Sequence, residues 1–261
     1  MWYNLCKFDA FLHFFICEGS MENFEIINKI LKKNNINVDE IAVKKLNKYY
    51  EILVDYNNKF NLTSITDIEG VALKHFADSM VKSDIYEPNA TLLDVGSGAG
   101  FPGIPLAIIR PDLKITLVDS LNKRIEFLNV VIEELQLNNV NAQHSRAQEF
   151  CTADRREKFD YCTARAVAPM NILLELCVPF IKVGGCFVGY KSINLDTEMA
   201  EAKNAMEILG VKEYAMYDIE LVGLDENAEV LQRKIIQLKK QKSSPKKYPR
   251  PKNLIKLKPI C

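Results

Sequence analysis

Strand and helix patterns alternate along most of this chain, and this alternation restricts its fold more than any other feature. Patterns typical of strands cover residues 91–95, 114–119, 140–144, 159–164 and 185–190, with helical patterns between them. Two last strand patterns, at 211–219 and 230–238, could pair antiparallel at the edge of a sheet. The alternation predicts a Rossmann-like α/β fold, a doubly wound and mostly parallel sheet with an antiparallel edge strand.

A glycine-rich loop follows the first predicted strand, in the stretch LLDVGSGAGFPGIP that runs from Leu92 to Pro105. A glycine inside a regular element costs roughly 0.5 to 1 kcal/mol relative to alanine, so a cluster of glycines works against stability. Sheets of this class bind ligands beyond the carboxyl ends of their strands. The loop therefore indicates a place where a ligand approaches the backbone closely.

The spacing of the glycines separates three kinds of cofactor. A phosphate-binding loop of the Walker type needs a lysine, and none occurs between residues 91 and 113. The dinucleotide pattern GxGxxG would place its third glycine where Phe101 stands. The remaining pattern, GxGxG at Gly96, Gly98 and Gly100, is typical of S-adenosylmethionine-dependent methyltransferases. A tight connection between strand and helix is the alternative interpretation of the glycines alone.

An acid at the end of the second predicted strand supports an adenosine cofactor. Asp119 follows Gly96 by 23 residues, where a carboxylate can accept hydrogen bonds from both ribose hydroxyls. Asp119 could instead be the N-cap of the next helix. Loop and acid together favour S-adenosylmethionine, so Gly96, Gly98, Gly100 and Asp119 are predicted to bind it.

The charge of the chain is distributed unevenly, although its net charge is zero. Residues 230–261 carry eleven bases and no acid, whereas the remaining 229 residues carry 23 bases and 34 acids. This basic segment includes Tyr248, and its composition suits contacts with phosphates and stacking on bases. We expect it to bind RNA and to be separable from the cofactor site; a solvated, disordered terminus is the alternative.

The part of the chain before the sheet divides into two stretches. Residues 1–20 are apolar and unlike the rest, and they indicate either a start before the natural one at Met21 or an extension packed on the body. Residues 21–87 show helical patterns, one of them beginning after Asp39 and another, at 68–85, containing His75. We therefore expect a helical region at 21–87 and the methyltransferase domain at 88–261.

Several classes of protein are disfavoured by composition. The apolar run at 11–17 is too short to span a membrane and lacks a signal-peptide cleavage site. The seven cysteines include no CxxC pair, which indicates reduced thiols and predicts neither disulfides nor a metal site. We expect a cytoplasmic monomer without a membrane partner.

Six motifs, in order along residues 21–258, make the resemblance to a known family specific. The chain resembles the glucose-inhibited division protein B family, the ribosomal small-subunit methyltransferases G. The motifs are NKFNLTSI, KHFADS, DVGSGAGFPGIPLAI, LVDSLNKRIEFL, TARAVAP and KYPR. The resemblance implies methylation of N7 of a guanine, guanine 527 in the family, in 16S ribosomal RNA; it leaves open whether free RNA or the small-subunit particle is the substrate.

The resemblance also implies roles for individual residues. Gly96 and Phe101, then Ala147 and Gln148, and finally Arg165 would contact S-adenosylmethionine. Guanine N7 has a free lone pair, so no general base is required and we name no catalytic acid or base.

The chain departs from the family pattern at three positions. Gln148 replaces a usual glutamate, and Asn253 and Ile255 stand near the usual glycine and proline after KYPR. Two other functions stay open: a methyltransferase of the same fold acting on a protein or small molecule, and a non-catalytic RNA-binding module.

Overall fold

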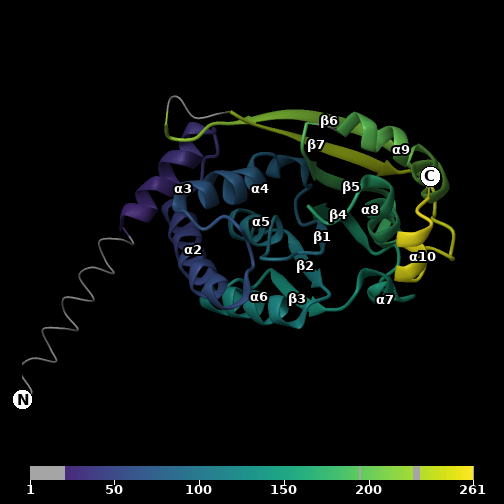
Figure 1. Ribbon diagram of the computed structural model, residues 1–261, viewed down its shortest axis with the longest axis horizontal. Helices are drawn as coiled ribbons and strands as arrows, with labels where there is room; N and C mark the ends of the chain where they lie inside the picture. The colour runs from purple at the N-terminus through teal and green to yellow at the C-terminus, as the bar shows by residue number, and fades with distance from the viewer. Residues whose placement is uncertain (1–20, 194, 226–229, 261) are drawn as a thin grey trace, which may run out of the picture.

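A seven-stranded sheet forms the centre of the molecule in the computed structural model, which describes residues 21–193, 195–225 and 230–260 (Figure 1). The strand order is β3-β2-β1-β4-β5-β7-β6. Strands β1 to β5 pair in parallel, while β7 is antiparallel to both of its neighbours. The strands are β1 Thr91–Val95, β2 Lys114–Asp119, β3 Val140–His144, β4 Phe159–Arg165, β5 Ile181–Lys191, β6 Val211–Leu221 and β7 Leu231–Lys240. The predicted fold class is confirmed.

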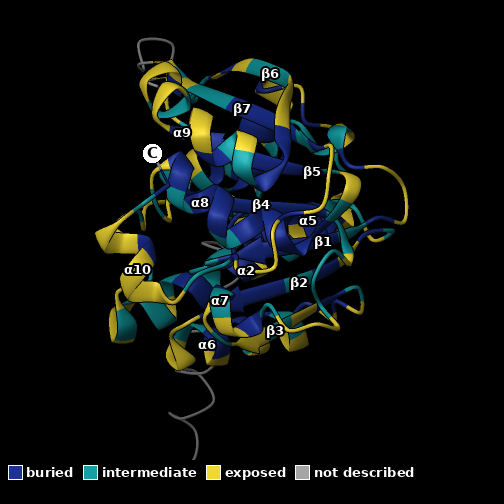
Figure 2. Cartoon of the chain, turned by 90° about the vertical axis from the view of Figure 1, so that its right-hand side faces the viewer, coloured by how far each residue is buried: buried dark blue, intermediate teal, exposed yellow. Residues whose placement is uncertain are grey.

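Helices cover both faces of the sheet, because successive strand residues point to opposite sides. On β1, Leu92 belongs to one core cluster and Leu93 to the other. The first cluster joins the sheet to α2, α5 and α6, and the second joins it to α7, α8 and α9. Figure 2 shows the inner strands as a mostly buried layer, whereas the edge strands β3 and β6 are more exposed. The helices are α2 Glu40–Phe60, α5 Gly103–Ile109, α6 Asn122–Glu134, α7 Ala147–Phe150, α8 Met170–Cys177 and α9 Leu195–Leu209.

The N-terminal helices share the first core with the sheet. Residues 21–33 are helical, as the sequence predicts, and their Ile27, Ile30 and Leu31 are fully buried. Helix α2 begins after Asp39, whose side chain accepts a hydrogen bond from the amide of Ala42, so the predicted N-cap is confirmed. The helical region is thus packed on the sheet as part of one core. No helix in the described ranges is long and apolar enough to cross a membrane.

The predicted helix at 68–85 is helical but is not one regular α-helix. It consists of α3 Ile68–Val71, the π-helical turn η1 Ala72–Ala77, α4 Asp78–Met80 and the 3-10 turn η2 Ser83–Ile85. Its N-cap is Asp67, which accepts from the amide of Gly70. The π turn is wider than an α-helical turn and changes the direction of the side chains that follow it. Such π turns are frequent at functional sites.

The basic segment after residue 230 is folded, and the stacking role that we expected for Tyr248 is wrong. It contains β7 and the short helix α10 Lys252–Leu257. Lys240 is fully buried, and its ammonium donates to Glu157 and to the carbonyls of Val178 and Ile181. Tyr248 is buried in the second core and is not available for stacking on bases. The segment is therefore not a disordered terminus, and part of its charge is internal.

An ion pair fixes the turn before α10 to helix α8. Arg250 donates from its guanidinium and from its amide to Glu175, a carboxylate that is almost completely buried. Arg156 donates to the carbonyls of Ser244, Pro245 and Tyr248. The exposed cations of the segment are lysines that follow β7: Lys242, Lys246, Lys247, Lys252, Lys256 and Lys258.

Four cysteines lie in the described ranges and carry free thiols, as predicted: Cys151, Cys162, Cys177 and Cys186. Residues 1–20, for which we considered an early start or an extension packed on the body, lie outside the described residues.

Lys240→Ala should destabilise the protein although it removes a residue from a basic surface segment. The substitution removes the ammonium from two buried carbonyls and from the partly exposed Glu157, which keeps its hydrogen bonds from Ser243 and Ser244. We expect the free energy of unfolding to fall by about 3 kcal/mol, the low end for breaking a buried pair. The control Lys239→Ala removes the neighbouring cation, which lies over the exposed Tyr214 ring, and should cost below about 1 kcal/mol. Equal losses in urea denaturation would contradict this account.

Candidate cofactor site

A cavity of about 320 Å³ opens at the carboxyl ends of the parallel strands. The strand register produces it, because Val95 lies opposite Val118 and Asp119 lies opposite His144. The segments that follow β1, β2, β3 and β4 therefore begin at the same edge of the sheet. Four predicted residues line this cavity: Gly96, Asp119, Ala147 and Gln148.

The glycine loop has a fixed shape because elements on both sides hold its backbone. The amide of Gly98 donates to Asp119 Oδ2 at 2.9 Å. On the other side, the hydroxyl of Tyr49, from α2, donates to the carbonyl of Ala99. A Cβ on Gly100, where φ is +96°, would lie 2.7 Å from that hydroxyl oxygen. Glycine at 100 thus allows α2 to contact the loop directly.

Gly96 shows that the cavity needs a bare backbone. Its φ is +73°, and a Cβ there would lie 2.7 Å from Cγ2 of Val167. Both residues line the cavity, so a side chain at 96 would fill space between the two loops that enclose it. A glycine-lined cavity with a carboxylate beside it fits an adenosine cofactor whose non-polar parts need close backbone contact.

Asp119 organises this edge of the sheet and is not the N-cap of the next helix. Helix α6 begins at Asn122 with Leu121 as its N-cap. Asp119 Oδ1 accepts from the amide of Leu121, and Oδ2 accepts from Gly98 and from Arg124 at 3.1 Å. The carboxylate therefore connects the glycine loop to the start of α6, and the N-cap alternative is wrong.

The other four predicted residues, Gly98, Gly100, Phe101 and Arg165, do not line the cavity in this structure. Arg165 Nη1 donates to Asp78 at 2.7 Å, and its guanidinium lies 5.0 Å from the centre of the Phe101 ring. The structure thus places Arg165 and Phe101 together behind the loop, against the π turn η1. Their predicted contacts with the cofactor stay predictions.

His75, from the π turn, belongs to this group behind the loop. Its ring stacks on Phe101 with centroids 4.4 Å apart, and its Nε2 lies 2.9 Å from Thr63 Oγ1. Burial and the nearby Arg165 guanidinium lower the pKa of His75 to about 4. The imidazole is therefore neutral at neutral pH and is a poor candidate for a general base there.

Asp94 is a buried acid that we did not identify as functional from the sequence. It lies on β1 directly before the loop, and its Oδ2 accepts from the amide of Gly103 at 3.1 Å. Its Oδ1 has no hydrogen-bond partner among the described residues. Burial raises the pKa of Asp94 to about 7, against a partial lowering by the Gly103 amide. The sequence signal that could have identified Asp94 was the presence of an acid inside an otherwise apolar strand.

Helix α10 contributes three cavity residues that sequence reasoning also missed: Lys252, Ile255 and Lys256. Ile255 is 3% exposed, whereas both lysines are exposed. The basic segment thus forms part of the cavity, and our expectation that it is separable from the cofactor site is wrong. An isolated apolar pair among bases, Leu254-Ile255, was the only sequence signal for this packing.

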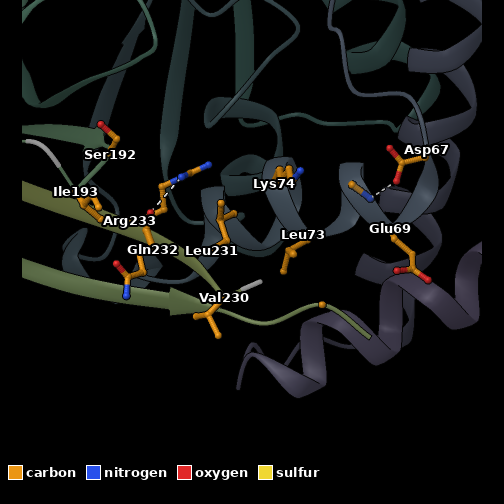
Figure 3. A pocket seen from close by; sticks show the side chains of 12 residues that line it. Asp67, Glu69, Leu73, Lys74, Ser192, Ile193, Val230, Leu231, Gln232 and Arg233 are labelled. Carbon is orange, nitrogen blue, oxygen red and sulfur yellow. Dashed lines mark hydrogen bonds between the residues drawn. The ribbon is translucent and has the colours of Figure 1, made fainter. Parts of the chain in front are cut away.

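A second and larger cavity, of about 830 Å³, lies between the π turn and the start of β7 (Figure 3). Two bases, Lys74 and Arg233, and two acids, Asp67 and Glu69, are its charged lining residues. Figure 3 shows the acids on the α3 side, away from Arg233. This cavity is balanced in charge, unlike the first. In the described ranges, no group of three or more His, Cys, Asp or Glu could hold a metal ion.

Comparison with known sequences decides the family. The family model described as rRNA small subunit methyltransferase G matches residues 42–237. The chain belongs to this family. It is 48% identical over 223 residues to ribosomal RNA small subunit methyltransferase G of Lysinibacillus sphaericus, covering 84% of this chain and 92% of that protein. The Alkaliphilus metalliredigens protein of the same name is 42% identical over 244 residues, covering 92% of this chain and 100% of the relative.

A solved structure supports the fold. The S-adenosylmethionine-dependent methyltransferase from Aquifex aeolicus superposes with a TM-score of 0.50 at 15% identity, covering 68% of this chain and 96% of that one. Family membership makes S-adenosylmethionine the cofactor. The recognised resemblance is thus confirmed.

The raised pKa of Asp94 predicts how stability depends on pH. An acid whose pKa is higher in the folded state takes up a proton on folding, so its favourable contribution is lost as pH rises through about 7. Asp94→Asn should therefore increase the free energy of unfolding relative to wild type, and the increase should grow between about pH 5 and about pH 8.

A second acid serves as the control. The Arg110 guanidinium lowers the pKa of Asp112 to about 2, so Asp112→Asn should give a difference that does not change between about pH 5 and about pH 8. Parallel stability profiles for wild type and Asp94→Asn would contradict the assignment.

Proposed function

We propose that this chain transfers a methyl group from S-adenosylmethionine to N7 of a guanine in 16S ribosomal RNA. The observation that carries the proposal is the cavity lined by Gly96 and Asp119, in a chain whose family is that of the small-subunit methyltransferases. Its location at the carboxyl ends of parallel strands is where this fold class binds cofactors. We further propose that the enzyme acts as a monomer in the cytoplasm.

Methylation at N7 makes modest chemical demands, which the described residues meet. The nitrogen attacks with its own lone pair, so no proton has to be removed first. The neutral His75 is packed against Phe101 and satisfied by Thr63, which is consistent with a structural role. Catalysis then depends mainly on alignment of the two reactants, and proximity of this kind can supply roughly 7 to 11 kcal/mol.

In this proposal, different residues of the cavity contact different parts of the cofactor. S-adenosylmethionine supplies a methyl group on a cationic sulfur. Asp119 would accept the ribose hydroxyls, and the start of α7, at Ala147 and Gln148, would contact the adenine. Gly96 would allow close approach of the methionine part. In this proposal the main chain of residue 148 contacts the adenine. Glutamine in place of the usual glutamate changes only the side chain and is therefore compatible with binding.

The cationic rim of the cavity favours RNA over the other substrates. Arg124, Arg146, Lys252 and Lys256 line it, with Asp119 as the only acidic lining residue in the described ranges. A small-molecule or protein substrate gives no reason for this excess of positive charge. The intact cavity also disfavours a non-catalytic RNA-binding module.

The test combines complementation with a matched pair of glycine variants. A bacterial strain without the gene should lack N7-methylguanine at one position of its 16S RNA, and the wild-type gene should restore it. Gly96→Ala should fail to restore it, because the new Cβ fills the cavity beside Val167. Gly184 has a similar left-handed φ of +91°, with no atom within 4 Å of a new Cβ. Gly184→Ala therefore introduces the backbone strain without any steric clash.

Both alanines should lower stability by about 1 to 2 kcal/mol. Only Gly96→Ala should weaken S-adenosylmethionine binding, by at least about tenfold, which corresponds to 1.4 kcal/mol. Equal cofactor affinity in the two variants would show that the ligand binds elsewhere. Unchanged 16S RNA in the deletion strain would rule out the proposed substrate.

A further inference from the structure

The charges around the cofactor cavity do not suit the cofactor alone. S-adenosylmethionine has a sulfonium, an ammonium and a carboxylate, and therefore one net positive charge. Four bases and one acid line the cavity. Two of the bases have acidic partners: Arg124 pairs with Asp119 at 3.1 Å, and Arg146 lies 3.9 Å from Glu149. Within the described ranges, Lys252 and Lys256 form no ion pair.

We propose that RNA phosphates bind Lys252 and Lys256 at the rim of the cavity, and that this contact strengthens binding of the cationic cofactor. The inference rests on the proposed function and extends it to how substrate and cofactor affect each other. It concerns α10 and the adjoining depression between α7 and α10, whose charged lining residues are Arg146, Lys252 and Glu149. Arg146, Gln148 and Lys252 line both the depression and the cavity, so the two adjoin.

Contacts of α10 and of the turn before it hold these two lysines near the cavity. Ile255 lies between them in sequence and is buried at the cavity wall. The pair between Arg250 and the almost completely buried Glu175 anchors the chain just before α10. Since α10 cannot leave without breaking these contacts, its two cations repel a bound sulfonium until an anion neutralises them.

A bound polyanion removes this repulsion and adds attraction of its own. RNA phosphates are fixed anions that lysines neutralise with release of counterions. By thermodynamic linkage, if RNA strengthens binding of S-adenosylmethionine, the cofactor strengthens binding of RNA by the same factor. The demethylated product, S-adenosylhomocysteine, has no sulfonium charge and should be coupled to RNA much more weakly. The arrangement would therefore favour release of the used cofactor over that of the fresh one.

The experiment measures the affinities of S-adenosylmethionine and S-adenosylhomocysteine with and without RNA. The probe is unmethylated 16S RNA from a strain that lacks the gene, used free and as the purified small subunit. For wild type, we expect RNA to strengthen S-adenosylmethionine binding by about 5-fold or more, the lower end of usual coupling between two sites. The effect on S-adenosylhomocysteine should be smaller, and added salt should reduce the difference.

A pair of double variants tests whether the two lysines carry the coupling. Lys252→Gln with Lys256→Gln should bind S-adenosylmethionine more tightly than wild type without RNA and should lose most of the RNA effect. The control, Lys246→Gln with Lys247→Gln, removes the same charge from exposed positions of the same segment that line neither cavity nor depression. It should weaken RNA binding while keeping the wild-type coupling.

Four results would overturn the inference. Coupling that is unchanged in Lys252→Gln with Lys256→Gln would show that other groups carry it. Weaker S-adenosylmethionine binding by that variant without RNA would show that the lysines hold the cofactor carboxylate instead. RNA binding without any effect on cofactor affinity would contradict the coupling but leave the proposed function intact, whereas failure to bind S-adenosylmethionine at all would remove both.

Discussion

The rest of the site depends on a backbone loop that is held from two sides. After β1 the chain turns through Gly96, Gly98 and Gly100 with positive φ angles, and each free backbone group must find a fixed partner. Asp119 accepts from the Gly98 amide, while the Tyr49 hydroxyl donates to the Ala99 carbonyl. The first contact connects the loop to β2, and the second connects it to α2. A buried hydroxyl and a buried carboxylate thus define where a ligand can approach.

The contact between Tyr49 and the glycine loop makes the N-terminal helices part of the support of the cofactor cavity. Tyr49 stacks against Phe76 and Phe101, with ring centroids 5.5 and 5.4 Å apart. The same aromatic group extends to His75, from the π turn, and to Arg165, at the end of β4. Packing of the helical region is therefore coupled to the geometry of the cofactor cavity. On the opposite side, α10 completes the cavity and presents lysines at its rim.

Local patterns in the sequence predicted most of the fold. The limits of β1, β2 and β3 were predicted to the residue, from apolar runs in β1 and β2 and from alternating apolar and polar residues in β3. The helical stretch expected at 68–85 is helical, but its π turn was not predicted, since a π turn has no distinctive composition. Helices α7 and α10 were missed because they are short and depend on tertiary contacts.

The site was predicted less completely than the fold. Glycine spacing and Asp119 identified the cavity wall because both features are local. The roles of Ile255, Lys252 and Lys256 depend on contacts across the whole chain and could not be deduced from spacing. A basic composition also could not show that Lys240 is internal and that Arg250 is paired with a buried glutamate. Burial decides which charges of such a segment can meet RNA.

The most direct test of the account is the affinity of Tyr49→Phe for S-adenosylmethionine. This substitution keeps the stacked ring and removes only the hydrogen bond to the loop. Loss of one such bond, about 1 kcal/mol, should weaken cofactor binding by about 5-fold. The control Tyr50→Phe removes a hydroxyl that bonds the carbonyl of Thr66, outside the glycine loop, and should bind as wild type does. If Tyr49→Phe binds the cofactor with unchanged affinity, the loop does not depend on α2 and the central claim is contradicted.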